Sequence, residues 1–98
     1  MNSMMSGFGG QCPPAIQTWY VYILKCRDGT HYVGKTKDIV KRLERHEKGQ
    51  VSYTAPRRPV SLVVYIAFPD EWKAVGLEKY LKSGAGRAFA KKHFYQES

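Results

Sequence analysis

Two tyrosines, an arginine, a histidine and a glutamate are the side chains in this sequence that could act together on a phosphate ester. Tyr22 and Tyr32 are ten residues apart, Arg42 and His46 follow at helical spacing, and Glu78 stands alone further along the chain. Phosphodiester hydrolysis commonly uses a divalent cation, and hard cations prefer carboxylate oxygen. The set therefore predicts metal-assisted cleavage of a phosphodiester, with Glu78 as the metal ligand.

The chemistry requires cations close to the two phenols. A phenol has an ordinary pKa of about 10, so it is a poor base at neutral pH. Lys35, Arg42, His46 and a metal ion nearby would each favour the phenolate form of Tyr22 or Tyr32. Arg42 also has the planar guanidinium group that suits a phosphate gaining charge in the transition state. We therefore expect these side chains to share one pocket.

Each candidate also has an ordinary structural interpretation. Glu78 and Lys82 are four residues apart and could form a surface ion pair on a helix. Tyr22 and Tyr32 could be half-buried packing residues of strands. Arg42 could belong to a solvated helix face. The chemical interpretation depends on all of these groups meeting in one place.

Hydrophobic periodicity predicts an α+β fold in the order β-β-α-β-α-α, with helices packed on an antiparallel sheet. We expect strands over 19–26, 31–34 and 60–68, and helices from Thr36 or Asp38 to Gly49, over 71–83 and over 87–94. The first helix should bury Ile39, Val40 and Leu43. The third strand should place on one face Leu62, Val64, Ile66 and Phe68.

The turn between the first two strands decides whether the tyrosines can cooperate. Paired hairpin residues share a face and each strand alternates with period two, so Tyr22 and Tyr32 share a face only if the loop has an odd number of residues. A three-residue loop over 28–30, with Gly29 left-handed, would place Tyr32 opposite Cys26. A two-residue turn would put the phenols on opposite faces.

The length and charge of the chain narrow its class. The chain has 98 residues and a net charge of +8, and each half carries eight Lys or Arg against four acids. One domain over 19–94 is expected, with a flexible leader over 1–18 and a short tail over 95–98. The two cysteines suggest neither a disulfide framework nor a metal site, and no membrane segment or secretory signal is evident, which favours the cytoplasm.

A positive surface spread through the fold suits a polyanion such as nucleic acid. In the long loop over 50–59, a tyrosine and two arginines could stack on a base and contact the backbone, although a merely soluble loop explains them nearly as well. The residues that we expect to contact nucleic acid are Lys35, Arg42, Arg45, Tyr53, Arg57, Arg58, Lys82 and Arg87.

The order and spacing of these motifs resemble the GIY-YIG nuclease family over residues 19–94, in particular its small stand-alone bacterial members related to the excision-repair incision nuclease domain. The matching positions are Val21-Tyr22-Ile23, Tyr32-Val33-Gly34, Lys35, Arg42, His46 and the pattern from Glu78 to Phe89. Tyr20 stands where the family's first glycine often lies.

The resemblance implies a three-stranded antiparallel sheet flanked by helices and one Mg²⁺ or Mn²⁺ ion bound by Glu78. It implies an endonuclease that hydrolyses DNA, with RNA as a further possible substrate, in DNA repair or recombination. A protein partner could supply specificity. Two alternatives remain open at this point: a non-catalytic nucleic-acid-binding module, and a protein-interaction adaptor that kept the fold.

Overall fold

The computed structural model describes residues 18–95, so the predicted leader lies almost entirely outside the described residues, as does most of the predicted tail. The elements are β1 (Trp19–Lys25), β2 (His31–Thr36), α2 (Ile39–Glu47), the short 3₁₀ helix η1 (Ala55–Arg57), β3 (Ser61–Phe68), α3 (Glu71–Lys82) and α4 (Gly84–His93). The predicted α+β class and element order are confirmed, and the loop contains η1 in addition. None of the helices within residues 18–95 is long and apolar enough to cross a membrane.

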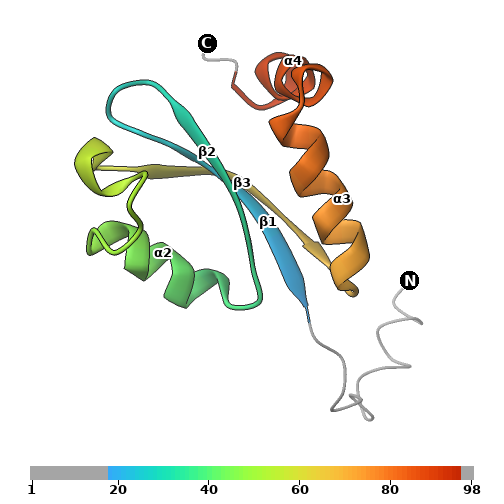
Figure 1. Ribbon diagram of the computed structural model, residues 1–98, viewed down its shortest axis with the longest axis horizontal. Coiled ribbons are helices and arrows are strands. Elements are labelled where there is room, and N and C mark those ends of the chain that lie inside the picture. The colour runs from blue at the N-terminus through green and yellow to red at the C-terminus, as the bar shows by residue number, and fades with distance from the viewer. Residues whose placement is uncertain (1–17, 96–98) are drawn as a thin grey trace, which may run out of the picture.

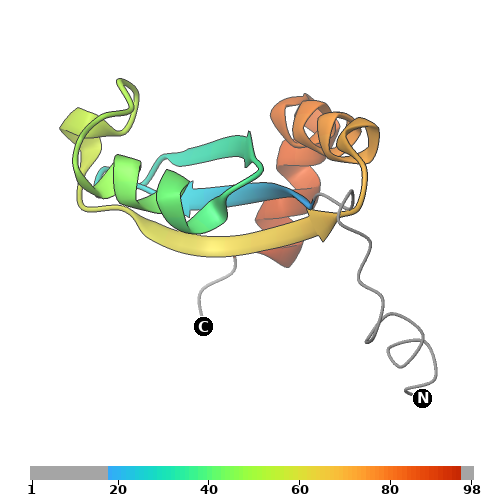
Figure 2. The same ribbon diagram turned by 90° about the horizontal axis from the view of Figure 1, so that it is seen from below.

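The three strands form one antiparallel sheet in the order β2-β1-β3. Figure 1 shows α2 and the α3–α4 pair lying apart, with the strands between them, and Figure 2 shows the sheet nearly edge-on. One face of β1 packs on α3 and α4 through Val21, Ile23, Ala74, Leu81 and Ala90. Tyr22 points to the other face, where α2 lies.

The hairpin between β1 and β2 has the odd loop that the shared face requires. Cys26 pairs with Thr30, whose carbonyl accepts a 2.8 Å hydrogen bond from the Cys26 amide. The three loop residues are therefore 27–29, and Gly29 has the predicted left-handed conformation, with φ of 88°. The predicted register was wrong by two residues, because Tyr32 lies opposite Leu24 rather than Cys26. The Asp28 carboxylate closes the turn by accepting from the backbone N–H of Thr30 at 3.0 Å.

Two apolar residues that we assigned to packed faces of the first helix and the third strand are exposed. Val40 is 64% exposed, because α2 turns Ile39, Leu43 and His46 toward the sheet and leaves Val40 outside that stripe. Leu62 is 42% exposed, because a β-bulge between Ile23 and Leu24 shifts its pairing and moves it off the core face. Both errors arise where the chain departs from a regular repeat.

Helix caps confirm the predicted starts and ends around the site. The Asp38 carboxylate accepts a 3.0 Å hydrogen bond from the backbone N–H of Lys41 and caps α2. Gly49, with φ of 76°, follows the last turn in the left-handed conformation that ends many helices. These caps fix where Arg42 and His46 emerge over the sheet.

Candidate active site

The Tyr22 phenol lies directly across Gly34 of the neighbouring strand. Tyr22 pairs with Gly34 in the β1–β2 register. A Cβ atom at Gly34 would come within 3.0 Å of the Tyr22 ring and hydroxyl. Only glycine leaves room for the phenol here, which is why the second sequence motif ends in glycine. Tyr32 lies on the same face, with its ring centroid 6.2 Å from that of Tyr22.

A chain of hydrogen bonds leads from Tyr22 into the protein. The Tyr22 hydroxyl is 2.9 Å from His46 Nε2, and His46 Nδ1 is 2.7 Å from Thr54 Oγ1. Thr54 Oγ1 in turn donates to the carbonyl of Val51 at 3.4 Å. Tyr22, His46 and Thr54 are all 0% exposed. We assign the Thr54 proton to the Val51 carbonyl; with that assignment the Thr54 oxygen accepts from His46 Nδ1–H, and His46 Nε2 is left to accept from Tyr22.

Burial keeps the two titratable members of this chain neutral. It raises the pKa of Tyr22 to about 12, although Arg42 acts in the opposite direction. Burial, followed by the charges of Arg42 and Arg45, lowers the pKa of His46. We expected cations to favour a phenolate, but for Tyr22 desolvation outweighs Arg42. At neutral pH the Tyr22 O–H therefore donates to an uncharged imidazole.

Arg42 and Glu78 both reach Tyr22 electrostatically. Arg42 lowers the Tyr22 pKa through a hydrogen-bonding contribution and through its charge, whereas the Glu78 charge raises it. Glu78 lies on α3, and its carboxylate is 3.2 Å from Lys82 Nζ, with the Glu78 side chain only 21% exposed. A helix on each side of the sheet thus contributes one charged group that acts on the Tyr22 pKa. The ion pair with Lys82 is present as well, so the two sequence interpretations of Glu78 are compatible.

The structure does not bring Lys35 to the phenols. β2 continues to Thr36, and Lys35 pairs with Val21, so it lies on the face opposite Tyr22 and Tyr32. Its ammonium group is 3.4 Å from a Glu71 carboxylate oxygen and 4.5 Å from the Trp19 ring centroid. This geometry gives Lys35 a structural role and leaves its predicted catalytic role without a contact.

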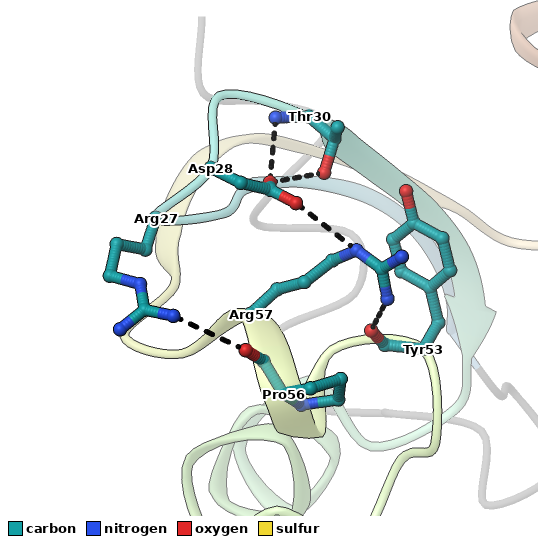
Figure 3. A network of polar contacts seen from close by, with 6 residues as sticks. All are labelled: Arg27, Asp28, Thr30, Tyr53, Pro56 and Arg57. Atoms are coloured by element: carbon teal, nitrogen blue, oxygen red, sulfur yellow. Dashed lines mark hydrogen bonds and ion pairs between the residues drawn. The ribbon is translucent and has the colours of Figure 1, made fainter.

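The two arginines of the loop over 50–59 form contacts within the protein. Arg57 lies 3.2 Å from the Asp28 carboxylate and donates to the Tyr53 carbonyl at 2.6 Å, while its guanidinium lies 4.0 Å from the Tyr53 ring centroid (Figure 3). Arg58 donates to the carbonyls of Ala55 and Glu47 at 2.9 Å and 3.0 Å. These bonds tie the loop to the hairpin and to the end of α2. A nucleic-acid contact by either arginine stays a prediction.

A cavity of about 730 Å³ opens beside Tyr32. Three of the predicted nucleic-acid contacts line it: Tyr53, Lys82 and Arg87. Arg45 is exposed on α2 and does not line it. Sequence reasoning missed the remaining polar and aromatic lining, which consists of His31, Lys91 and Tyr95. It also missed Thr54, because a threonine in a loop carries no local signal of a buried partner.

Glu78 fits a weakly held divalent ion. Mg²⁺ usually keeps several waters and binds through one or two carboxylates together with substrate phosphate. Within residues 18–95 no group of three or more His, Cys, Asp and Glu gathers as a closed metal site. The Glu78 carboxylate, in a side chain that is 21% exposed, can supply one such oxygen ligand and leaves the other positions to water and phosphate. The assignment of Glu78 as a ligand stays a prediction.

Comparisons with known proteins point to one family. Residues 18–92 match the family model described as the GIY-YIG catalytic domain. A UPF0213 protein of Pediococcus pentosaceus is 41% identical over 70 residues, covering 70% of this chain and 74% of the relative. A UPF0213 protein of Staphylococcus saprophyticus is 45% identical over 65 residues, covering 65% of this chain and 79% of the relative.

A solved structure is similar as well. The solution NMR structure of a UPF0213 protein from Bacillus halodurans shares 36% identity and a TM-score of 0.51, covering 76% of this chain and 83% of that one. Together these matches confirm the resemblance that the tyrosine motifs predicted. They also confirm the three-stranded α+β fold.

Proposed function

This chain belongs to the GIY-YIG family, a family of nucleases, and from that premise we propose that it is an endonuclease that hydrolyses DNA phosphodiester bonds with one Mg²⁺ or Mn²⁺ ion. The observation that carries the proposal is that groups from three further elements contact Tyr22 or act on its pKa. Tyr32 comes from β2, Arg42 and His46 come from α2, and Glu78 comes from α3.

The two phenols have different roles in this proposal. Tyr32 is half-buried and lines the open cavity, so it is the phenol that would meet the attacking water. Tyr22 is fully buried and holds its proton toward His46 Nε2, so it is a positioning residue that orients the imidazole and neighbouring Arg42. Arg42 stabilises the negative charge that gathers on the phosphate.

Glu78 would hold the divalent ion through a carboxylate oxygen. When bound, such an ion polarises the phosphate and stabilises developing charge. Displacing Lys82 from its 3.2 Å contact with Glu78 frees the carboxylate for the ion and leaves Lys82 for the phosphate backbone. We extend the proposal to a cytoplasmic role in DNA repair or recombination, with a protein partner that supplies specificity.

The test is cleavage of labelled single-stranded, duplex and branched DNA with Mg²⁺ or Mn²⁺, and with EDTA instead. Glu78→Gln should abolish cleavage and leave DNA affinity nearly unchanged, because it removes the carboxylate and keeps the fold. Glu44→Gln, on the exposed face of α2, is the matched control for charge and should cleave like the wild type. Binding with a steep salt dependence but intact strands under all metal conditions would instead indicate a non-catalytic binding module.

A further inference from the structure

We propose that the cavity beside Tyr32 binds one unpaired nucleotide next to the cleaved phosphate, so that the preferred substrate is DNA with unpaired nucleotides rather than continuous duplex. This inference rests on the proposed nuclease function and adds its substrate class. The cavity, of about 730 Å³, lies in the size range of small-molecule sites. That size suits a single base with its phosphate.

The lining has the two components that single-strand binding uses. Aromatic rings come from Tyr32, Tyr53 and Tyr95, and cations come from Lys82, Arg87 and Lys91. Among the described residues, none of those that line the cavity is acidic. Rings on which a base stacks, beside cations that follow the phosphates, bind single strands without reading the sequence.

The aromatic rings are held in place before any ligand arrives. Tyr53 is 39% exposed, and its centroid lies 5.7 Å from that of Tyr32. The Arg57 guanidinium lies against the Tyr53 ring and is itself anchored to Asp28 (Figure 3). On the opposite side of β2, the Tyr95 ring stacks on His31 with centroids 3.6 Å apart and an interplanar angle of 8°. Such pre-organisation reduces the entropy lost when a base stacks.

The cavity adjoins the proposed cleavage site, because Tyr32 belongs to both. Tyr32 lines the cavity and its ring centroid lies 5.1 Å from that of His46. Lys82 also lines the cavity and contacts the Glu78 carboxylate at 3.2 Å. A nucleotide in the cavity would therefore adjoin a phosphate held near Glu78. A base within a continuous duplex is stacked and paired, so it would first have to leave the helix, at an energetic penalty that an unpaired base avoids.

The test is binding in EDTA, measured by fluorescence anisotropy with Glu78→Gln protein so that cleavage cannot interfere. A single-stranded oligonucleotide should bind at least about 10-fold more tightly than the same sequence as blunt duplex. Tyr53→Ala should weaken single-strand binding by roughly 10-fold, while Tyr53→Phe keeps the ring and the affinity. Tyr65→Ala, at a tyrosine that is 52% exposed on β3 and outside the cavity, is the matched control.

A stacking probe adds a readout of the base itself. An oligonucleotide with one 2-aminopurine should lose fluorescence on binding, and Tyr53→Ala should restore it. Equal affinity for single strand and duplex, or unchanged single-strand affinity in Tyr53→Ala, would overturn the inference even if the wild type cleaves DNA. Conversely, the expected binding pattern in a protein that cleaves nothing would remove the nuclease function and leave the nucleotide site.

Discussion

The hydroxyl of Thr54 sets which ring nitrogen of His46 carries the proton, so Thr54→Val is a sharp test of the site. In the assigned tautomer Thr54 accepts from His46 Nδ1 at 2.7 Å, which leaves His46 Nε2 free to accept from Tyr22 at 2.9 Å. Valine has nearly the shape of threonine but cannot accept a hydrogen bond. The substitution therefore removes the acceptor and keeps the packing.

The size of the effect follows from burial. The His46 ring is 0% exposed, so an N–H without a partner there is desolvated, which is unfavourable by about 1–3 kcal/mol. Moving the proton to Nε2 would relieve that loss but would turn an N–H toward the Tyr22 hydroxyl and end its donation. If this whole free-energy penalty raises the activation free energy of cleavage, the cleavage rate should decrease by roughly 5- to 150-fold. The free energy of unfolding should decrease by about 1–3 kcal/mol.

The assay is single-turnover cleavage as a function of pH, with a urea titration of each variant. Losing the Nδ1–H bond disfavours charged His46 more than neutral His46, so the acid limb of the rate profile should move to lower pH. Thr54→Ser keeps the hydroxyl and should restore both rate and profile. A Thr54→Val protein with the wild-type rate and profile would refute the tautomer argument. A slower protein with an unshifted profile would show that Thr54 does not act through the protonation of His46.

Three further outcomes are expected. Gly34→Ala should displace the Tyr22 phenol, lower the free energy of unfolding by about 1–3 kcal/mol and abolish cleavage, and a variant with wild-type values of both would contradict the close approach. Lys35→Gln should change the cleavage rate less than about 3-fold, since Lys35 lies on the far face, and a loss above about 10-fold would reinstate it as catalytic. Because the folded pKa of His46 is lowered, the unfolded chain takes up that proton first, so unfolding free energy should fall as pH drops below about 6.5. His46→Gln should flatten that slope in urea titrations, and an unchanged slope would assign it to other groups.

Local sequence signals account for most of the fold. Asp38 and Gly49 bound α2 because a carboxylate cap and a left-handed glycine act within one turn of the helix. The shared face of Tyr22 and Tyr32 followed from the parity of the hairpin loop alone. Such features need only a few neighbouring residues, so sequence reasoning reaches them.

Features that depend on distant parts of the chain were not predictable in the same way. The bulge that exposes Leu62 arises between β1 and β3, about forty residues apart. The bond from His46 to Thr54 exists because the loop after α2 folds back under the helix. Arg57 was interpreted as a phosphate contact, and no local pattern indicates that Asp28 approaches it.

The position of Lys35 shows how one strand boundary changes a catalytic assignment. If β2 ended at Gly34, as predicted, the chain could turn and carry Lys35 toward the phenols. Because β2 runs to Thr36, Lys35 is still part of the strand. It follows Tyr32 by three residues, an odd number, so period-two alternation places it on the opposite face. Near Tyr22 this leaves Arg42 as a cation that lowers the pKa of the phenol. Its effect is smaller than that of burial, since the Tyr22 pKa is about 12. The site therefore holds a neutral phenol and a neutral imidazole in one hydrogen-bonded chain, so the cations near Tyr22 do not turn this phenol into a base.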